Sequence, residues 1–185
     1  MTRPAHRLLV VDDEAHMVHA LQRLVRQRLG PGVGCMATTS AAQALAWAGT
    51  HAFDAVLSDL RMPEMDGLAL LGRVAQAQPH AALLLLTGAA DFASAQKAVN
   101  QVGVFRYLTK PWHDDELLGQ LQAALAHGAL AREHAADALT FALASGRLSP
   151  QDLERRRLEA LEPGITEVAW GPQGEVLLAP WEPDT

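Results

Sequence analysis

The chain has 185 residues, of which 49% are hydrophobic and 19% are charged, and its formal net charge is −6 at pH 7. This composition is typical of a folded protein and excludes disorder along the whole length. The length allows one domain of ordinary size with a smaller appendage. No apolar run is long enough for a secretory signal or a membrane span, so we expect a cytoplasmic protein. The single cysteine, Cys35, excludes an internal disulfide.

Five short apolar segments alternate with segments of helical length along the first two thirds of the chain. The predicted strands are residues 7–11, 34–37, 55–58, 83–86 and 104–108. Most of them are apolar at nearly every position, which indicates strands that are covered on both faces, as in a parallel sheet. The alternation predicts an α/β fold with a doubly wound, five-stranded parallel sheet that extends to about residue 126.

Helices are predicted between the strands, where capping residues and glycines mark their ends. They cover residues 14–29, 40–48, 68–77 and 91–101, and a further helix begins near residues 113–116. Acidic residues near residues 113–116 favour a helix start there, because they interact well with the positive end of a helix dipole. Gly128 interrupts the pattern that follows, so either one kinked helix or two helices reach residue 144.

The chain beyond residue 127 carries signals for a small additional element. Ser149 and Pro150 are typical of the first positions of a helix, which is predicted to end at Leu161. Residues 165–170 and 175–179 flank a turn of glycine and proline and predict a β-hairpin. We therefore expect one domain at residues 1–127, followed at residues 128–185 by a helical extension with a terminal β-hairpin that serves interaction or dimerisation.

Polar side chains follow or end four of the predicted strands, at the edge of the sheet where functional groups of this fold class collect. Asp12 and Asp13 follow the first strand, Asp59 ends the third, Thr87 ends the fourth and Lys110 follows the fifth. Three carboxylates at one point repel one another unless a cation is present. Mg²⁺ suits a site with few carboxylates and room for water, so the sequence predicts that these three aspartates hold it.

Lys110 and Thr87 point to the chemistry of phosphate. The Lys110 ammonium is a compact positive charge for a phosphoryl group, and the Thr87 hydroxyl can donate a hydrogen bond to one of its oxygens. Cation, ammonium and hydroxyl together describe a phosphoryl-transfer site in which positioning and charge neutralisation provide most of the catalysis. Asp12 and Asp13 alone would be read as an exposed loop pair, so the prediction depends on the whole set.

Four segments of the sequence resemble the receiver domains of two-component response regulators. They are LLVVDDE at residues 8–14, AVLSDLRMPEMDG at 55–67, LLLTG at 84–88 and RYLTKP at 106–111. The resemblance covers about residues 6–126 and is specific because the motifs occur together and in order. It implies a flavodoxin-like receiver fold and a signalling switch. No enzyme activity is expected beyond self-phosphorylation and autodephosphorylation.

The resemblance also implies roles for the acidic residues. Asp59 would be the phosphoacceptor, phosphorylated by a histidine kinase or a phosphotransfer protein. Asp13, Asp59 and the backbone carbonyl of Arg61 would bind Mg²⁺ directly, and Asp12 would act mainly through water. A competing hypothesis is an aspartyl-phosphate hydrolase similar to the haloacid dehalogenase phosphatases. Those enzymes need a second acid two residues after the nucleophile, where this chain has Arg61.

Further residues would form the switch and set the lifetime of the phosphorylated state. By resemblance, Tyr107 turns inward when Thr87 is drawn to the phosphoryl group, although Tyr107 could also be an ordinary half-buried strand residue. The family's cis peptide would fall at Lys110–Pro111. Our hypothesis for the lifetime is that large Arg61 shields the acyl phosphate while small Ala89 gives no help to the hydrolytic water.

The extension limits what the output can be. Residues 128–185 carry five arginines, no lysine and ten acidic residues, a formal charge of −5, whereas a DNA-binding module should be basic. We therefore expect signalling to an unknown downstream protein by protein–protein contact. A transcriptional regulator with an atypical output is the alternative. Apolar residues in one heptad phase leave a homodimer through about residues 114–145 and packing onto the receiver equally open.

Overall fold

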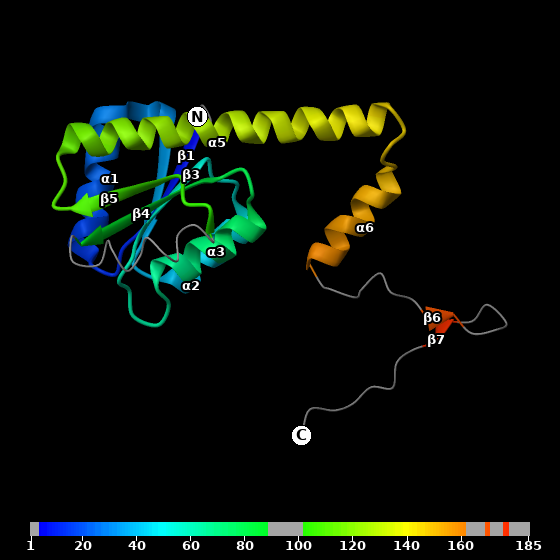
Figure 1. The fold of residues 1–185 in the computed structure, drawn as a ribbon, viewed down its shortest axis with the longest axis horizontal. Helices are drawn as coiled ribbons and strands as arrows, with labels where there is room; N and C mark the ends of the chain where they lie inside the picture. Colours follow the sequence, from blue (N-terminus) through cyan, green and yellow to red (C-terminus); the bar gives the residue numbers. More distant parts are fainter. Residues whose placement is uncertain (1–3, 89–101, 162–168, 171–175, 178–185) are drawn as a thin grey trace, which may run out of the picture. The chain divides into compact units, whose positions relative to one another are not determined.

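The computed structural model describes residues 4–88, 102–161, 169–170 and 176–177 (Figure 1). The chain divides into two compact units, Met1–Ala136 and Asp137–Thr185. The division falls inside a long helix, beyond the boundary at residue 127 that the sequence predicts. Within the described residues, the structure contains no helix whose length and apolar character would let it cross a membrane.

The first unit is built on a five-stranded parallel sheet, as predicted. Its strands are β1 (His6–Val11), β2 (Val33–Thr38), β3 (Ala55–Asp59), β4 (Ala82–Gly88) and β5 (Arg106–Lys110). They are arranged in the order β2-β1-β3-β4-β5. The order places β1, β3 and β4 in the interior of the sheet, where both faces are covered. The near-continuous apolar character of these strands follows from that position.

The fifth strand begins two residues later than predicted and ends at Lys110. Pairing with β4 continues to the partners Gly88 and Lys110, so polar residues extend the ladder beyond the apolar run. Val104 and Phe105 precede the strand, yet both pack against the hydrophobic core. Their apolar character therefore reflects packing from a loop and not membership of the strand.

Helices cover both faces of the sheet. The described helices of this unit are α1 (Ala15–Leu29), α2 (Ala41–Thr50), α3 (Gly67–Ala77) and the first part of α5 (Asp114–Ala144). The helix predicted at residues 91–101 lies outside the described residues. Successive side chains of a strand point to opposite faces. Accordingly, Leu8 and Val10 of β1 pack with α1 and α5, whereas Leu9 and Val11 pack with α2 and α3.

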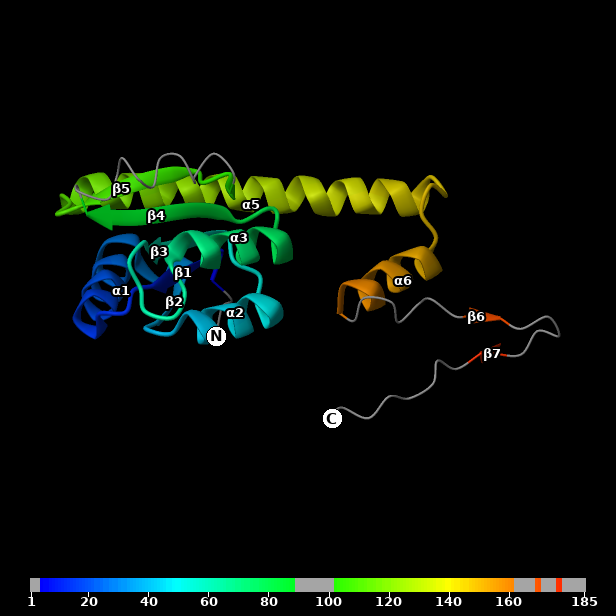
Figure 2. The ribbon, with the colours of Figure 1, turned by 60° about the horizontal axis from the view of Figure 1, so that its bottom comes forward.

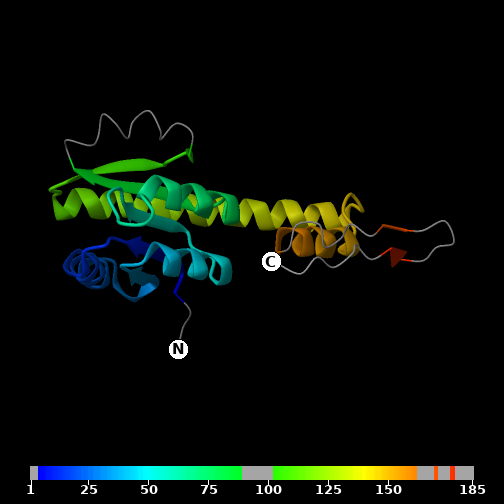
Figure 3. The ribbon, with the colours of Figure 1, turned by 90° about the horizontal axis from the view of Figure 1, so that it is seen from below.

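Helix α5 runs without interruption from Asp114 to Ala144, which decides between the two alternatives left open by Gly128 (Figure 3). Leu118, Leu121 and Leu125 are buried, and Leu121 and Leu125 belong to the core cluster that α5 shares with the sheet. The first half of α5 lies beside β4 and β5 (Figures 2 and 3). This part of the apolar stripe therefore packs onto the chain's own sheet. It is not free to form a dimer seam, so the predicted homodimer can involve only the later residues of the range.

The second unit contains the end of α5, the helix α6 (Pro150–Leu161), and an antiparallel pair of short strands, β6 (Ala169–Trp170) and β7 (Val176–Leu177). The predicted helix start is confirmed, because the Ser149 hydroxyl accepts a hydrogen bond from the Asp152 amide at 3.1 Å. The same hydroxyl donates to the Asp152 carboxylate at 2.7 Å. The strand pair confirms the predicted β-hairpin at its described positions.

Candidate functional site

The polar residues that end the strands meet at the carboxyl edge of the sheet. Asp59, the last residue of β3, pairs with Leu86, and the next residue of β4 is Thr87. The residue after Thr87 on β4 is Gly88, which pairs on the other side of β4 with Lys110, the last residue of β5. Asp12 follows β1, the neighbour of β3 on its other side. The register therefore brings residues from distant parts of the sequence to one place, as predicted.

Lys110 bridges the two buried carboxylates of this edge. Its Nζ lies 2.9 Å from Asp12 Oδ2 and 2.5 Å from Asp59 Oδ1. Asp12 is 1% exposed and Asp59 is 5% exposed, so water screens these interactions only weakly. Burial opposes the charge of Lys110, but its hydrogen bonds to Asp59 and Asp12 outweigh burial and raise its pKa. Lys110 is therefore held in the charged form.

Backbone amides bind the remaining oxygens of the two carboxylates. Asp12 Oδ1 accepts from the Glu14 amide at 2.9 Å, and Asp59 Oδ2 accepts from the Arg61 amide at 2.7 Å. Burial nevertheless raises the pKa of Asp59, and the nearby charge of Asp12 adds to the shift, while Lys110 opposes it. One ammonium for two buried carboxylates leaves the pair short of positive charge.

Two buried carboxylates, Asp12 and Asp59, share the single ammonium of Lys110, and this excess of negative charge is the observation that fits a divalent cation. Asp12, Asp59 and the Arg61 carbonyl would offer only oxygen donors, which suit Mg²⁺ with water completing its coordination. Asp13, the third predicted carboxylate, is exposed beside Asp12. Among the described residues, no three side chains of histidine, cysteine, aspartate or glutamate are gathered closely enough to bind a metal by themselves. Water and phosphate oxygens would therefore have to supply part of the coordination.

The other predicted residues occupy positions around this cluster. Thr87 is 1% exposed, and its hydroxyl donates to the Gly88 carbonyl at 3.2 Å. Tyr107 on β5 is half-buried and packs against the hydrophobic core. The peptide bond between Lys110 and Pro111 is cis, as the resemblance implies. Ala89 lies outside the described residues, so its predicted influence on hydrolysis remains a prediction.

Gly67 positions strand β3 at Asp59, a role that sequence reasoning missed. A Cβ atom at Gly67 would lie 2.0 Å from the Asp59 carbonyl oxygen, so only glycine fits where α3 begins. The Gly67 amide also donates to the Leu60 carbonyl at 3.0 Å. Asp66 caps the helix through its side chain, which accepts from the Ala69 amide at 2.7 Å. The aspartate–glycine pair at the end of the second motif, residues 55–67, was the available signal.

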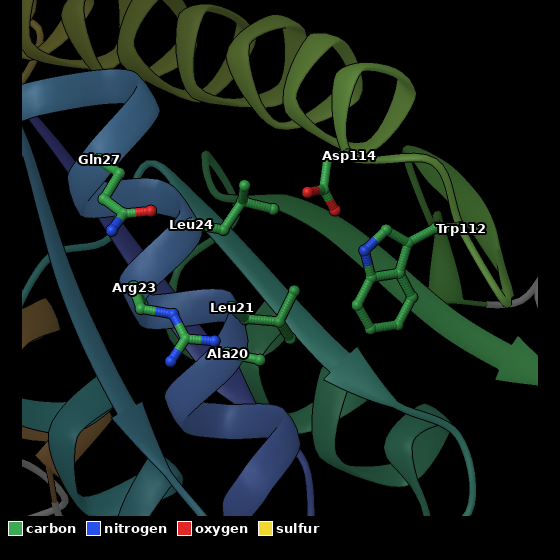
Figure 4. Close-up of a pocket in the computed structure, with 7 residues that line it drawn as sticks. All are labelled: Ala20, Leu21, Arg23, Leu24, Gln27, Trp112 and Asp114. Atoms are coloured by element: carbon green, nitrogen blue, oxygen red, sulfur yellow. The ribbon is translucent and has the colours of Figure 1, made fainter.

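Two hollows lie beside α1: the first is mainly apolar and includes Lys110 of the cluster, and the second is also lined by the polar residues Arg23, Gln27 and Asp114. One of about 450 Å³ is lined by Met17, Lys110, Pro111 and Trp112. Another of about 260 Å³ shares Trp112, which faces Leu21 and Leu24 of α1 across the hollow (Figure 4). Together they form a surface that we call the α1 groove, and Lys110 belongs both to the groove and to the carboxylate cluster. Sequence reasoning gave Trp112 no role.

Comparisons with known proteins agree with this geometry. The family model for the response regulator receiver domain matches residues 8–122. The DNA-binding transcriptional regulator NtrC of Escherichia coli K12 is 36% identical over 118 residues, which are 64% of this chain and 24% of NtrC. The transcriptional regulatory protein ZraR of the same strain is 35% identical over 147 residues, which are 80% of this chain and 31% of ZraR.

Solved structures show the same fold. The signal receiver domain of an HD domain-containing protein from Pseudomonas fluorescens Pf-5 matches with a TM-score of 0.64 and 34% identity, covering 72% of this chain and 96% of that one. An uncharacterized protein from Neptuniibacter caesariensis matches with a TM-score of 0.65 and 31% identity, covering 71% and 95%. The matches to NtrC and ZraR span only about a quarter to a third of those proteins. On the family model and these relatives, the chain belongs to the receiver domain family of two-component response regulators.

Proposed function

We propose that the chain is a phosphorylation switch in which Asp59 accepts a phosphoryl group from a phosphohistidine. The observation that carries the proposal is the position of Asp59, buried at the end of β3 between the Lys110 ammonium and the Arg61 amide. A carboxylate oxygen of Asp59 attacks phosphorus, the phosphorus–nitrogen bond breaks, and the released imidazole takes up a proton. The product is an acyl phosphate on Asp59.

The chain's own groups prepare this transfer mainly by charge and position. Lys110 fixes one oxygen of Asp59 and supplies positive charge, while the Arg61 amide fixes the other oxygen. The Thr87 hydroxyl lies at the same sheet edge and can exchange its bond to the Gly88 carbonyl for one to a phosphoryl oxygen. Asp12, Asp13, Asp59 and the Arg61 carbonyl would hold Mg²⁺, which supplies charge neutralisation when bound.

Mass spectrometry after incubation with acetyl phosphate and Mg²⁺ tests the phosphoacceptor. We expect the wild-type chain to gain the mass of one phosphoryl group, in a bond that hydroxylamine cleaves, and Asp59→Asn to gain none. Asp115→Asn is the matched control, because Asp115 is exposed and lies at the start of α5. An adduct that persists in Asp59→Asn would refute the assignment. Chelation with EDTA should abolish the reaction in all variants.

We further propose that the α1 groove receives the protein that donates the phosphoryl group. The apolar part of its lining, Met17, Pro111 and Trp112, shares a hollow with Lys110, which contacts Asp59, so a protein seated there has its surface next to Asp59. Trp112→Ala should slow phosphorylation by a histidine kinase that phosphorylates the wild-type chain, but leave phosphorylation by acetyl phosphate unchanged. Leu130→Ala, which also removes an exposed apolar side chain, is the control. Equal slowing with both donors would argue for damage to the site itself.

The output that we propose is a phosphorylation-dependent change in protein–protein contacts, without a further enzymatic activity. The formal charge of −5 on residues 128–185 supports this, because a DNA-binding surface is normally basic. NtrC is a DNA-binding regulator by name, but the match to it covers 24% of that protein. A second candidate is therefore a transcriptional regulator. Binding of random DNA fragments by the chain at low salt would favour that candidate.

The lifetime of the acyl phosphate is the last part of the proposal. Arg61 follows Asp59 by two residues and is exposed, and we propose that its long side chain shields the phosphoryl group from water. We expect Arg61→Ala and Ala89→Glu each to speed autodephosphorylation, measured as loss of the phosphoryl adduct after removal of acetyl phosphate. If neither substitution speeds the loss, the hypothesis about these two residues is wrong.

A further inference from the structure

The opposite end of β3 holds a second buried carboxylate, that of Asp54. This residue directly precedes the strand and is 0% exposed. Its Oδ2 accepts from the Arg7 amide at 2.8 Å, and its Oδ1 lies 2.8 Å from Nη1 of Arg132. The contact with Arg132 is an ion pair without a well-aligned hydrogen bond. Removing either partner of such a pair lowers the stability of the fold, because the other partner keeps a charge without a counterion.

The backbone of Asp54 ties together three strands. Its amide donates to the Arg7 carbonyl at 2.8 Å, and its carbonyl accepts from the Ala82 amide at 2.9 Å. These residues lie on β1 and at the start of β4. Asp54 is therefore a fixed point of the sheet, and a helix that contacts it is held to the sheet as a whole.

Helix α5 contacts this fixed point at Gly128. A Cβ atom there would lie 1.8 Å from the Asp54 carbonyl oxygen and 2.7 Å from its carbonyl carbon. At Gly119, on the same helix, a Cβ atom would meet nothing within 4 Å. Glycine inside a helix costs about 1 kcal/mol relative to alanine. The close approach to Asp54 is the physical reason for accepting that cost at residue 128.

Arg132 lies one turn further along α5 and is 39% exposed. It also lines an open hollow of about 360 Å³ with Pro4, Ala5, Arg7 and Ala52. Its guanidinium therefore has space to leave Asp54 without displacing the core. Both Gly128 and Arg132 come after residue 122, where the match to the receiver family ends.

We propose that Asp54, Gly128 and Arg132 form a latch, the Asp54 latch, that clamps residues 129–136 of α5 to the receiver. A short helical segment in water is only marginally stable, and Gly128 weakens it further. Without the latch, α5 would fray from Gly128 onward and the chain would continue as a flexible tether. With the latch closed, the helix is a rigid part of the receiver as far as Ala136. Release of Arg132 into the neighbouring hollow would open it.

Hydrogen exchange of the full chain, followed by mass spectrometry of peptides, tests the latch. In Arg132→Gln we expect amides of residues 129–136 to exchange about tenfold faster than in wild type, because the charged contact is lost. Glu133→Gln is the matched control, since it removes one neighbouring charge from an exposed position. If Arg132→Gln and Glu133→Gln exchange alike, the latch does not exist.

Two alanine substitutions provide an independent test with opposite expected signs. Helix propensity alone predicts that Gly128→Ala and Gly119→Ala both slow exchange in α5. The latch predicts that Gly119→Ala slows it, whereas Gly128→Ala speeds exchange at residues 129–136. Slower exchange in Gly128→Ala would overturn the proposal. Arg132→Gln should still be phosphorylated by acetyl phosphate at the wild-type rate, so failure of the latch and failure of the phosphoacceptor assignment can be told apart.

Discussion

The two ends of strand β3 are built from the same parts and differ in charge balance. At each end a buried aspartate meets a cation, and a helical glycine packs on its carbonyl oxygen. A Cβ would lie 2.0 Å from the oxygen of Asp59 at Gly67, and 1.8 Å from that of Asp54 at Gly128. Lys110, however, forms ion pairs with two carboxylates at the Asp59 end, whereas among the described residues Arg132 forms an ion pair with Asp54 alone.

This difference separates a reactive site from a structural one. A carboxylate with a full countercharge has little need of a further cation and mainly contributes stability. A pair of carboxylates that shares one ammonium retains negative charge, which favours binding of a divalent ion. Burial raises the pKa of Asp59, and the charge of Asp12 adds a smaller contribution. On our two proposals, the same strand thus presents an anchoring group, Asp54, at one end and a phosphoacceptor, Asp59, at the other. Substitutions at the two ends should consequently have different effects.

The largest expected effect is that of Gly67→Ala. The new methyl group would collide with the backbone of Asp59, so α3 must shift away from the strand, at a cost of about 3 kcal/mol in the free energy of unfolding. Phosphorylation by acetyl phosphate should also slow, because Asp59 moves relative to Lys110. Gly128→Ala should lower stability as well but leave phosphorylation unchanged.

Urea unfolding and the phosphorylation assay measure these two effects. Gly49→Ala on α2 is the matched control, since a Cβ there would meet nothing within 4 Å, and alanine should stabilise that helix by up to about 1 kcal/mol. If Gly67→Ala left both stability and phosphorylation at wild-type values, Gly67 would not position Asp59.

Replacing the two aspartates by asparagine should change stability in opposite directions. Asp54→Asn removes the charge that compensates Arg132 and should cost about 2 kcal/mol, reduced because Arg132 is partly exposed. Asp59→Asn should stabilise the metal-free chain slightly. The raised pKa of Asp59 means that folding disfavours its charged form, so loss of the charge removes a penalty.

Thermal unfolding in the presence of EDTA measures both changes. Adding Mg²⁺ should then raise the unfolding temperature of wild type and of Asp54→Asn, and have little effect on Asp59→Asn, because the proposed ion needs Asp59. Destabilisation of similar size in both asparagine variants without metal would remove the distinction between the two ends of the strand.

The Asp59 end could be predicted from the sequence because its residues interrupt apolar strands. Asp12, Asp59 and Lys110 each stand where a strand ends, and parallel strands bring such positions to one edge. What could not be predicted is how the charges pair. The structure places Lys110 between Asp12 and Asp59 and leaves Asp13 exposed, whereas the resemblance implied direct metal binding by Asp13 and Asp59 and no pairing of Asp12 with Lys110.

The Asp54 end gave no comparable signal. Asp54 is a single acidic residue before a strand, and its partner Arg132 lies on a helix whose continuity the sequence left open. Gly128 was interpreted as an interruption of that helix, although it is the residue that lets the helix approach the sheet. A contact that depends on the absence of a side chain leaves no pattern of charge or hydrophobicity to detect. Only the packed structure reveals it.

The smallest expected effect concerns His80, which lies near the Asp54 end. Burial lowers the pKa of His80 below 6.5, and the charge of Arg132 lowers it further, while Asp54 opposes the shift. The folded state binds a proton on His80 less tightly than the unfolded state does. The free energy of unfolding therefore has its full value, as far as His80 is concerned, above pH 6.5 and declines as the pH falls through 6.5. Arg132→Gln removes one cause of the shift, so the pKa of His80 should rise and the decline on acidification should become shallower. An NMR titration of the His80 ring, with Glu133→Gln as control, measures the change. A fall in the His80 pKa in Arg132→Gln would mean that Arg132 does not act on this end of the strand as the ion pair with Asp54 requires.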